Sequence, residues 1–188
     1  SKHLDRLFSI SDDLASLLAG LNTDKSYGLL LAEGIYGAVN LPANLQLSIL
    51  GACGESIATA TWTGGSQATI QVTGMQFQAG FALENPAHVD LENSHFKNAE
   101  GHAVSQQGGS LNFVSNTVTT SAGNGLTLTG AMAVIIGDNN FLGPLGGDGV
   151  FSDEQEGDLT IQGNRFEQVQ GNGVSVLSTK PSVAGVVI

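Results

Sequence analysis

The sequence predicts an all-β protein, a single-stranded parallel β-helix (a solenoid) of about 22–24 residues per coil with an N-terminal capping helix. Three observations support this fold class. A trio of apolar positions recurs along the chain, Gly-x-Gly triplets recur at the same interval, and asparagines hold a fixed place before the third apolar position. Self-similarity at such a period is typical of stacked-repeat architectures.

The apolar trio occupies offsets of zero, two and seven residues. Its first members follow one another at steps of 23, 19, 22, 23 and 25 residues. Leu47 and Ile49, followed by Gly51, match the first half, and the full trios are Ile70, Val72, Phe77; Val89, Leu91, Phe96; Leu111, Phe113, Val118; Val134, Ile136, Phe141; and Leu159, Ile161, Phe166. Such short strands are stable only if each coil pairs with its neighbours, about 4.8 Å away. We therefore expect the trio to point inward, with Phe77, Phe96, Phe141 and Phe166 in one internal stack.

Glycine and asparagine mark the corners between these strands. Gly-x-Gly triplets at 123–125, 147–149 and 171–173 are spaced 24 residues apart, and each precedes an apolar residue. Asn116, Asn139 and Asn164 each stand two residues before the third member of a trio. Asparagine tolerates left-handed backbone and bonds nearby backbone groups. We predict that these three asparagines stack at a sharp corner and have a structural role.

Other repeat folds fit less well. A β-sandwich would show turn signals every 8–12 residues, and a propeller blade runs to about 40. A helical solenoid needs apolar residues at three- and four-residue spacing, which is absent after about residue 25. Roughly six coils predict a stubby rod about 30 Å long.

The first residues differ from the rest. Residues 11–23, SDDLASLLAGLNT, have leucines at helical spacing, with Ser11 or Asp12 expected to cap the helix and Gly20 or Asn22 to end it. This helix would cover the open end of the first coil. We expect one domain over residues 1–188, with coils from about 28 to 188, and a chain that is a piece of a longer protein.

Composition excludes several kinds of partner. The chain carries 17 acidic and 6 basic residues, a net charge of −11, so it repels nucleic acid. No apolar run approaches the roughly 20 residues that span a bilayer. Cys53 is the only cysteine, which rules out an internal disulfide. It is interpreted as a small buried hydrophobe, with a bond to a partner as the alternative.

Three stretches carry a family resemblance: LLLAEGIYGAVNL, LQLSILGACG and LTIQGNRFEQVQGNGVSV. Together with the preceding helix, they resemble right-handed parallel β-helix proteins of the pectin-lyase-like group, over about residues 11–188. The resemblance implies right-handed coils and a bacterial secreted or cell-surface protein. The group includes lyases, hydrolases, adhesins and coils without catalysis, so its fold does not assign a function.

Carboxylates give the main candidate site. Asp148, Asp153, Glu154, Glu156 and Asp158 fall within eleven residues. Asp148, Asp153 and Glu154 are catalytic candidates, two of which would serve as acid and base on a glycosidic bond. Asp153, Glu154, Glu156 and Asp158 are candidate ligands for Ca²⁺, the only cofactor the sequence indicates. A solvated acidic loop between coils is the simplest interpretation.

The basic residues, the histidines and the tryptophan do not form a recognisable site in the sequence. Arg165 and Lys97 are interpreted as solvated, which disfavours a lyase that needs a basic side chain. His88, His95 and His102 are seven residues apart, a spacing that does not converge three imidazoles on zinc. Trp62 either points outward and stacks on a sugar ring as a ligand-binding residue, or fills the core.

The sequence favours a non-catalytic β-helical module of a secreted or surface protein, serving as a scaffold or recognising a polysaccharide or a protein. The alternative is a polysaccharide lyase or glycoside hydrolase with its site in the acidic loop. A third expectation is end-to-end self-association, because an open last coil would expose Val186, Val187 and Ile188.

Overall fold

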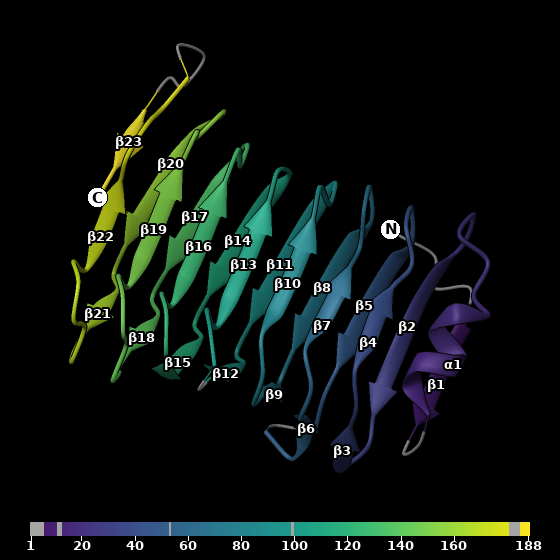
Figure 1. Cartoon of the computed structure of the whole chain (residues 1–188). Helices are drawn as coiled ribbons and strands as arrows, with labels where there is room; N and C mark the ends of the chain where they lie inside the picture. The colour runs from purple at the N-terminus through teal and green to yellow at the C-terminus, as the bar shows by residue number, and fades with distance from the viewer. Residues whose placement is uncertain (1–5, 11–12, 53, 99, 181–184) are drawn as a thin grey trace.

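The computed structural model describes residues 6–10, 13–52, 54–98, 100–180 and 185–188. In it the chain winds through about seven turns of a parallel β-solenoid with three sheets and one short N-terminal helix (Figure 1). Every coil contributes short strands that pair with the coils before and after it. This confirms the predicted all-β parallel β-helix.

Three parallel sheets form the walls of the solenoid. Sheet A contains β1 (Arg6–Ile10), β2 (Ser26–Leu31), β5 (Gln46–Leu50), β8 (Thr69–Thr73), β11 (His88–Glu92), β14 (Ser110–Val114), β17 (Val134–Gly137), β20 (Leu159–Gln162) and β23 (Val186–Val187). Sheet B contains β3 (Gly34–Tyr36), β6 (Ser56–Ala58), β9 (Met75–Phe77), β12 (His95–Asn98), β15 (Thr117–Ser121), β18 (Asn140–Phe141) and β21 (Arg165–Phe166). Sheet C contains β4 (Val39–Leu41), β7 (Trp62–Gly64), β10 (Phe81–Glu84), β13 (Val104–Gln107), β16 (Leu126–Thr129), β19 (Val150–Asp153) and β22 (Val174–Val176).

Strand register confirms the apolar trio. First members pair along sheet A, from Leu47 with Ile70 through to Val134 with Leu159. Third members pair along sheet B, from Phe77 with Phe96 through to Phe141 with Phe166. Alternation along each strand therefore buries one face and leaves the other outside.

Aromatic rings run along the core, but not as one continuous stack. Phe77 stacks on Phe96 with ring centroids 4.9 Å apart, and Phe141 stacks on Phe166 at 4.8 Å. Val118 occupies the position between Phe96 and Phe141, and Phe113 of sheet A leans between the two pairs. The predicted single stack is thus two stacked pairs bridged by a ring from another sheet.

Trp62 lies inside the core, with 0% of its surface exposed. Its ring packs edge-on against Phe77, and its Nε1 donates a hydrogen bond to the Gly37 carbonyl oxygen. The outward, sugar-stacking alternative for Trp62 is therefore wrong, because position 62 is the inward-facing start of β7.

The stacked asparagines hold coils together at the corner between sheets A and B. Asn139 Oδ1 accepts from the Asn116 backbone N–H at 2.8 Å, and Asn139 Nδ2 donates to the Phe113 carbonyl at 2.8 Å. Asn164 Oδ1 accepts from the Asn139 N–H at 3.0 Å. Asn116 and Asn139 are buried. The residues with left-handed backbone at this corner lie one position before the asparagines, at Ser115, Asp138 and Gly163.

Helix α1 (Leu14–Ala19) packs against β4 at the N-terminal end of the solenoid (Figure 1). Leu14 and Leu18 enter the core, as a capping helix requires. Asp13 is the N-cap, since its Oδ1 accepts from the Ser16 N–H at 3.1 Å, and Gly20 is the C-cap. The helix is thus shorter than the predicted 11–23, and capping by Ser11 or Asp12 falls outside the described residues, as does Cys53.

Strand β1 was not predicted. It adds to sheet A beyond β2 in parallel register, so β1 and α1 together occupy the N-terminal end. Within the part of the chain that the structure describes, α1 is too short to cross a membrane, and no other helix could.

Candidate functional site

Asp148 belongs to a ladder of side chains at the corner between sheets B and C. Asp148 Oδ1 accepts from the Asn172 N–H at 2.7 Å, and Asn124 Oδ1 accepts from the Asp148 N–H at 2.8 Å. His102 Nδ1 continues the ladder by accepting from the Asn124 N–H at 2.9 Å. The Asp148 carboxylate therefore bonds the backbone of the next coil and has a structural role at this corner.

The Gly-x-Gly triplets allow these coils to approach closely. A Cβ on Gly147 would lie 2.2 Å from Asn124 Oδ1, and one on Gly149 would lie 2.5 Å from the Phe166 ring. The first glycine therefore leaves space for the ladder side chain, and the second leaves space for an aromatic ring and a carbonyl of the next coil.

Asp148 does not share a site with Asp153. Strand β19 separates them, and four extended residues span about 13 Å. Acid–base pairs in glycosidases have carboxyl groups roughly 5 to 9.5 Å apart. Of the three catalytic candidates, only Asp153 and Glu154 lie together.

The acidic corner lies where sheet C turns into sheet A and gathers Asp153, Glu154 and Glu156. Asp153 Oδ1 accepts from Ser178 Oγ at 2.5 Å and from the Glu154 N–H at 2.8 Å. Glu156 pairs with Lys180, and this hydrogen bond raises the pKa of Lys180. Most of these carboxylates thus already have protein partners.

Asp158 stands apart from this corner, at the start of β20, and its Oδ1 accepts from the Gly185 N–H at 3.1 Å. Among the described residues, no three His, Cys, Asp or Glu side chains gather in a way that could hold a metal ion. The geometry therefore gives the Ca²⁺ hypothesis for Asp153, Glu154, Glu156 and Asp158 no support.

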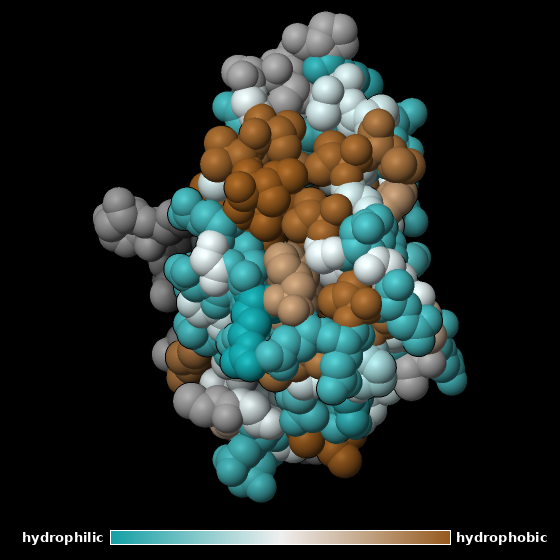
Figure 2. All heavy atoms as spheres, turned by 90° about the vertical axis from the view of Figure 1, so that its left-hand side faces the viewer, coloured by the Kyte–Doolittle hydropathy of each residue, from teal (hydrophilic) through white to brown (hydrophobic). Residues whose placement is uncertain are grey.

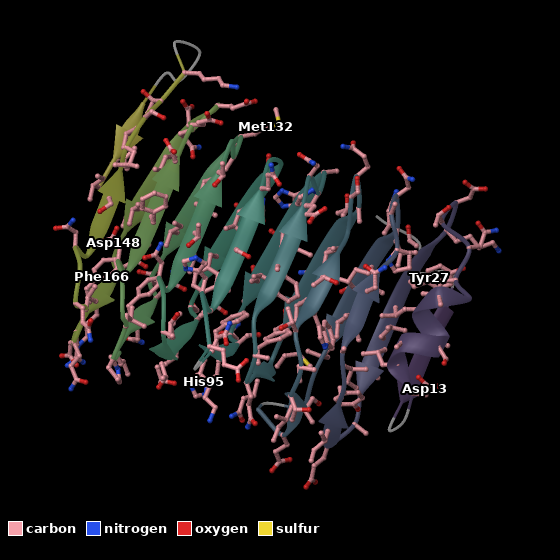
Figure 3. All side chains as sticks on the ribbon, viewed as in Figure 1. Asp13, Tyr27, His95, Met132, Asp148 and Phe166 are labelled. Carbon is pink, nitrogen blue, oxygen red and sulfur yellow. The ribbon has the colours of Figure 1, made fainter. Side chains whose placement is uncertain are left out.

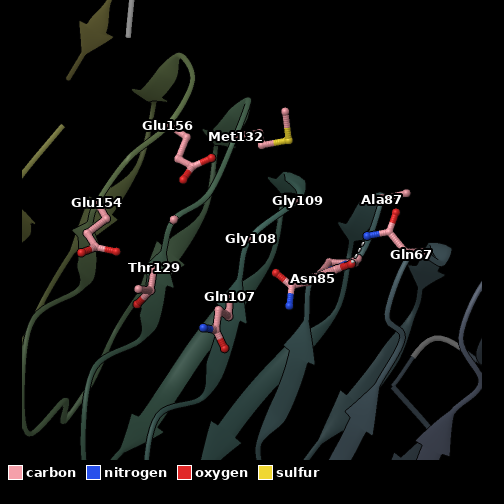
Figure 4. A pocket seen from close by; sticks show the side chains of 12 residues that line it. Gln67, Asn85, Ala87, Gln107, Gly108, Gly109, Thr129, Met132, Glu154 and Glu156 are labelled. Atoms are coloured by element: carbon pink, nitrogen blue, oxygen red, sulfur yellow. Dashed lines mark hydrogen bonds between the residues drawn. The ribbon is translucent and has the colours of Figure 1, made fainter. Parts of the chain in front are cut away.

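A hollow of about 390 Å³ lies at this same corner (Figure 4). Its walls come from successive coils and include Gln67, Asn85, Gln107, Thr129, Met132, Glu154 and Glu156, with Gly108 and Gly109 at its floor. Only Glu154 and Glu156 were singled out from the sequence. Polar side chains dominate the lining, with Met132 as an exposed apolar contact.

The hollow forms because the residue at the corner after each sheet C strand differs in size from one coil to the next. Asn85, Gly108, Gly130 and Glu154 occupy corresponding places after β10, β13, β16 and β19, and all four have left-handed backbone, with φ between 48° and 69°. Glycine is the residue that adopts this conformation at least cost. The two central glycines carry no side chain, so the flanking Asn85 and Glu154 form the walls.

A second hollow, of about 370 Å³, continues from the first across the outer face of sheet C. The two share Gln107 and Thr129, and the second adds Glu84, Ser105 and Thr127. We call the two hollows together the sheet C groove. It crosses the strands, so it runs along the axis of the solenoid.

Phe151 extends this surface and was missed in the sequence analysis. It pairs in register with Thr127, and it is partly exposed while Val150 and Ser152 are buried, so its ring faces outward on sheet C. The alternation in VFSD could have indicated this, because a buried Val150 requires an outward residue 151.

Arg165, His88 and His95 lie away from the sheet C groove. Arg165 and His95 are on sheet B, and Arg165 pairs with Glu167. His88 is on sheet A, where its Nε2 lies 3.0 Å from Asp90 Oδ1. Figure 3 shows His95 at the opposite edge of the solenoid from Met132. The three histidines therefore occupy different parts of the surface.

His95 lies in a partly buried environment that changes its pKa. It is half-buried at a register shift between β12 and β15, and its Nε2 lies 2.6 Å from Thr119 Oγ1. Burial, with a smaller contribution from nearby Lys97, lowers the pKa of His95. Burial therefore favours the neutral imidazole over the protonated form.

Three parallel sheets with coil-to-coil register and ladders at the corners define the protein as a single-stranded parallel β-helix. A family model described as right handed beta helix region matches residues 60–186. The chain therefore belongs to the right-handed β-helix family. Comparison with curated proteins and with solved structures gave no match.

Proposed function

We propose that the protein is a non-catalytic β-helical module of a secreted or surface protein that recognises carbohydrate in the sheet C groove. The observation that carries this proposal is the continuity of the groove with an outward aromatic ring. Sugar-binding surfaces combine an apolar platform with precisely placed polar groups. Phe151 supplies the platform, and the groove supplies amides and hydroxyls.

Three polar side chains of the groove are available to a ligand. Among the described residues, the side chains of Ser105, Gln107 and Thr129 have no hydrogen-bonding partner. An oligosaccharide lying along the axis would meet a new row of them every 4.8 Å or so. On sheet A, by contrast, outward polar side chains bond one another, as Asn112 does with Asp90.

The test is binding to an oligosaccharide array, followed by affinity measurements on variants. Phe151→Ala should weaken binding about three- to tenfold, because an aromatic contact contributes roughly 0.5–1.5 kcal/mol. Gln107→Ala should also weaken it. Ile135→Ala on sheet A and Gln76→Ala on sheet B are matched controls on other outer faces, and they should have no effect.

Two outcomes would contradict this proposal. Binding that survives both groove substitutions, or that the controls reduce equally, would place the ligand elsewhere. New reducing ends that disappear in Glu154→Gln would instead identify a polysaccharide-degrading enzyme acting at the edge of the groove.

A second candidate function is docking of another copy at the C-terminal end of the described solenoid. Leu177, Val187 and Ile188 are 67%, 58% and 73% exposed there, and Figure 2 shows hydrophobic residues gathered on this end. The Asn164 N–H and the Asn172 Oδ1, which would bond a further coil in the two ladders, have no described partner.

Because α1 and β1 occupy the other end, two copies would meet through the same surface, as a twofold dimer. Sedimentation should then show a dimer that Val187→Lys converts to a monomer. A monomer at all concentrations would refute this second candidate.

A further inference from the structure

The sheet C groove is surrounded by carboxylates. Glu84 closes β10 and Asp153 closes β19, while Glu154 and Glu156 line the corner. No Lys or Arg lines either hollow within the described residues. The nearest cation at this corner, Lys180, is paired with Glu156. A ligand in the groove therefore meets negative charge at both ends and no unpaired cation.

Resting on the proposed carbohydrate recognition, we propose that the groove selects neutral glycans and rejects their uronate counterparts. A uronate carries a carboxylate on each sugar ring, and several of these would lie within a Debye length, about 8 Å at physiological salt, of the groove carboxylates. Like charges placed together across an interface are strongly unfavourable. A neutral hydroxymethyl group at the same position has no such conflict.

The uncharged side chains of the groove provide the attraction for neutral glycans. Gln107 and Thr129 sit at the point shared by both hollows, between the Glu84 and Glu154 coils. Their amide and hydroxyl can donate to and accept from sugar hydroxyls. The carboxylates therefore decide which glycans are refused, while the amide, hydroxyl and aromatic groups supply attraction.

The experiment compares matched pairs of oligosaccharides that differ only at C6, such as manno-oligosaccharides and the corresponding mannuronates, or cello-oligosaccharides and their C6-oxidised forms. Binding is measured with EDTA present, so that no divalent cation bridges carboxylates. The uronate member of each pair should bind at least about tenfold more weakly. This difference should shrink as salt is raised, because screening weakens repulsion.

The variants separate a local from a global charge effect. Glu84→Gln combined with Glu154→Gln should reduce the discrimination, measured as the ratio of neutral to uronate affinity, at least threefold. The control combines Glu92→Gln on sheet A with Glu100→Gln, which changes net charge equally but lies outside the groove lining. It should leave the discrimination unchanged.

The outcomes distinguish this inference from the proposed function. Uronates that bind as tightly as neutral partners would overturn the selectivity and leave carbohydrate recognition standing. Discrimination that responds equally to the control variant would overturn the role of the groove carboxylates. A failure of every neutral and acidic member to bind would overturn the proposed function itself.

Discussion

At the scale of single residues, Asn139 shows how one side chain joins three coils. It accepts from Asn116 on the preceding coil, donates to Phe113 of that coil, and donates to Asn164 on the following one at 2.9 Å. Only 1% of the surface of Asn139 is exposed, so these hydrogen bonds are buried. A buried polar group in this position is stabilising only while every partner is present.

Asn139→Ala should therefore lower the free energy of unfolding by about 2–4 kcal/mol, because it leaves a buried N–H and a buried carbonyl unpaired. Urea denaturation followed by circular dichroism measures this. The neighbouring Asn140→Ala, whose side chain is exposed on sheet B, is the control and should cost little. Equal effects of the two substitutions would contradict the ladder's contribution.

His95 links a single residue to pH. Its pKa is lowered in the folded state, so the folded protein resists taking up a proton that the unfolded chain accepts near its ordinary pKa of about 6.5. Stability should consequently rise with pH across this window, and it should fall as pH drops below about 6.5 until the folded pKa is passed.

Unfolding measured between pH 5 and 7.5 tests this directly. His95→Gln should flatten the dependence, and Lys97→Gln should reduce it in part, because Lys97 adds to the lowering of the His95 pKa. Stability curves that run parallel in wild type and His95→Gln would contradict the assignment.

At the scale of elements, the Gly-x-Gly corner sets how closely coils pack before sheet C begins. A Cβ on Gly125 would lie 2.6 Å from the Gly149 carbonyl oxygen and 2.8 Å from the Phe141 ring. Gly125→Ala should destabilise the fold by about 1–3 kcal/mol through overpacking. Gly37→Ala is the matched control, since nothing lies within 4 Å of its Cβ. Thermal unfolding midpoints compare them, and a shift no larger at Gly125 than at Gly37 would argue against close packing.

The strands that belong to the repeats could be predicted from the sequence, whereas β1 and the start of α1 could not. Leu47 to Leu159 supply regular anchors, so sheets A and B follow from spacing alone. Strand β1 has no anchor at the repeat interval and becomes recognisable only through its pairing with β2. Helix α1 was expected from its leucines, but its start depends on Asp13 reaching the Ser16 N–H, a local geometry that several neighbouring polar residues could equally have provided.

The candidate groove could be predicted only in part. Glu154 and Glu156 stood out as charged residues, whereas Gln107 and Thr129 read as ordinary outward residues of a strand. Their significance depends on which coils lie side by side and on the glycines at the corner between them. Trp62 was a candidate ligand-binding residue because of its aromatic ring, but it lies in the core. Phe151 follows the buried Val150 and faces outward.

At the scale of the whole molecule, the solenoid presents three outer faces that differ in use. On sheet A, polar side chains bond one another, and sheet B carries Lys97 and Arg165. Sheet C carries a groove with polar side chains that have no described partner and with carboxylates at its rim. We therefore propose sheet C as the recognition face.

A nuclear magnetic resonance titration with the neutral oligosaccharide that binds best tests this claim most directly. We expect the largest chemical-shift changes along the groove and its aromatic extension, at Ser105, Gln107, Thr129 and Phe151, with little change on sheets A and B. Shift changes centred on His88, His95 or the Val187 end would contradict it.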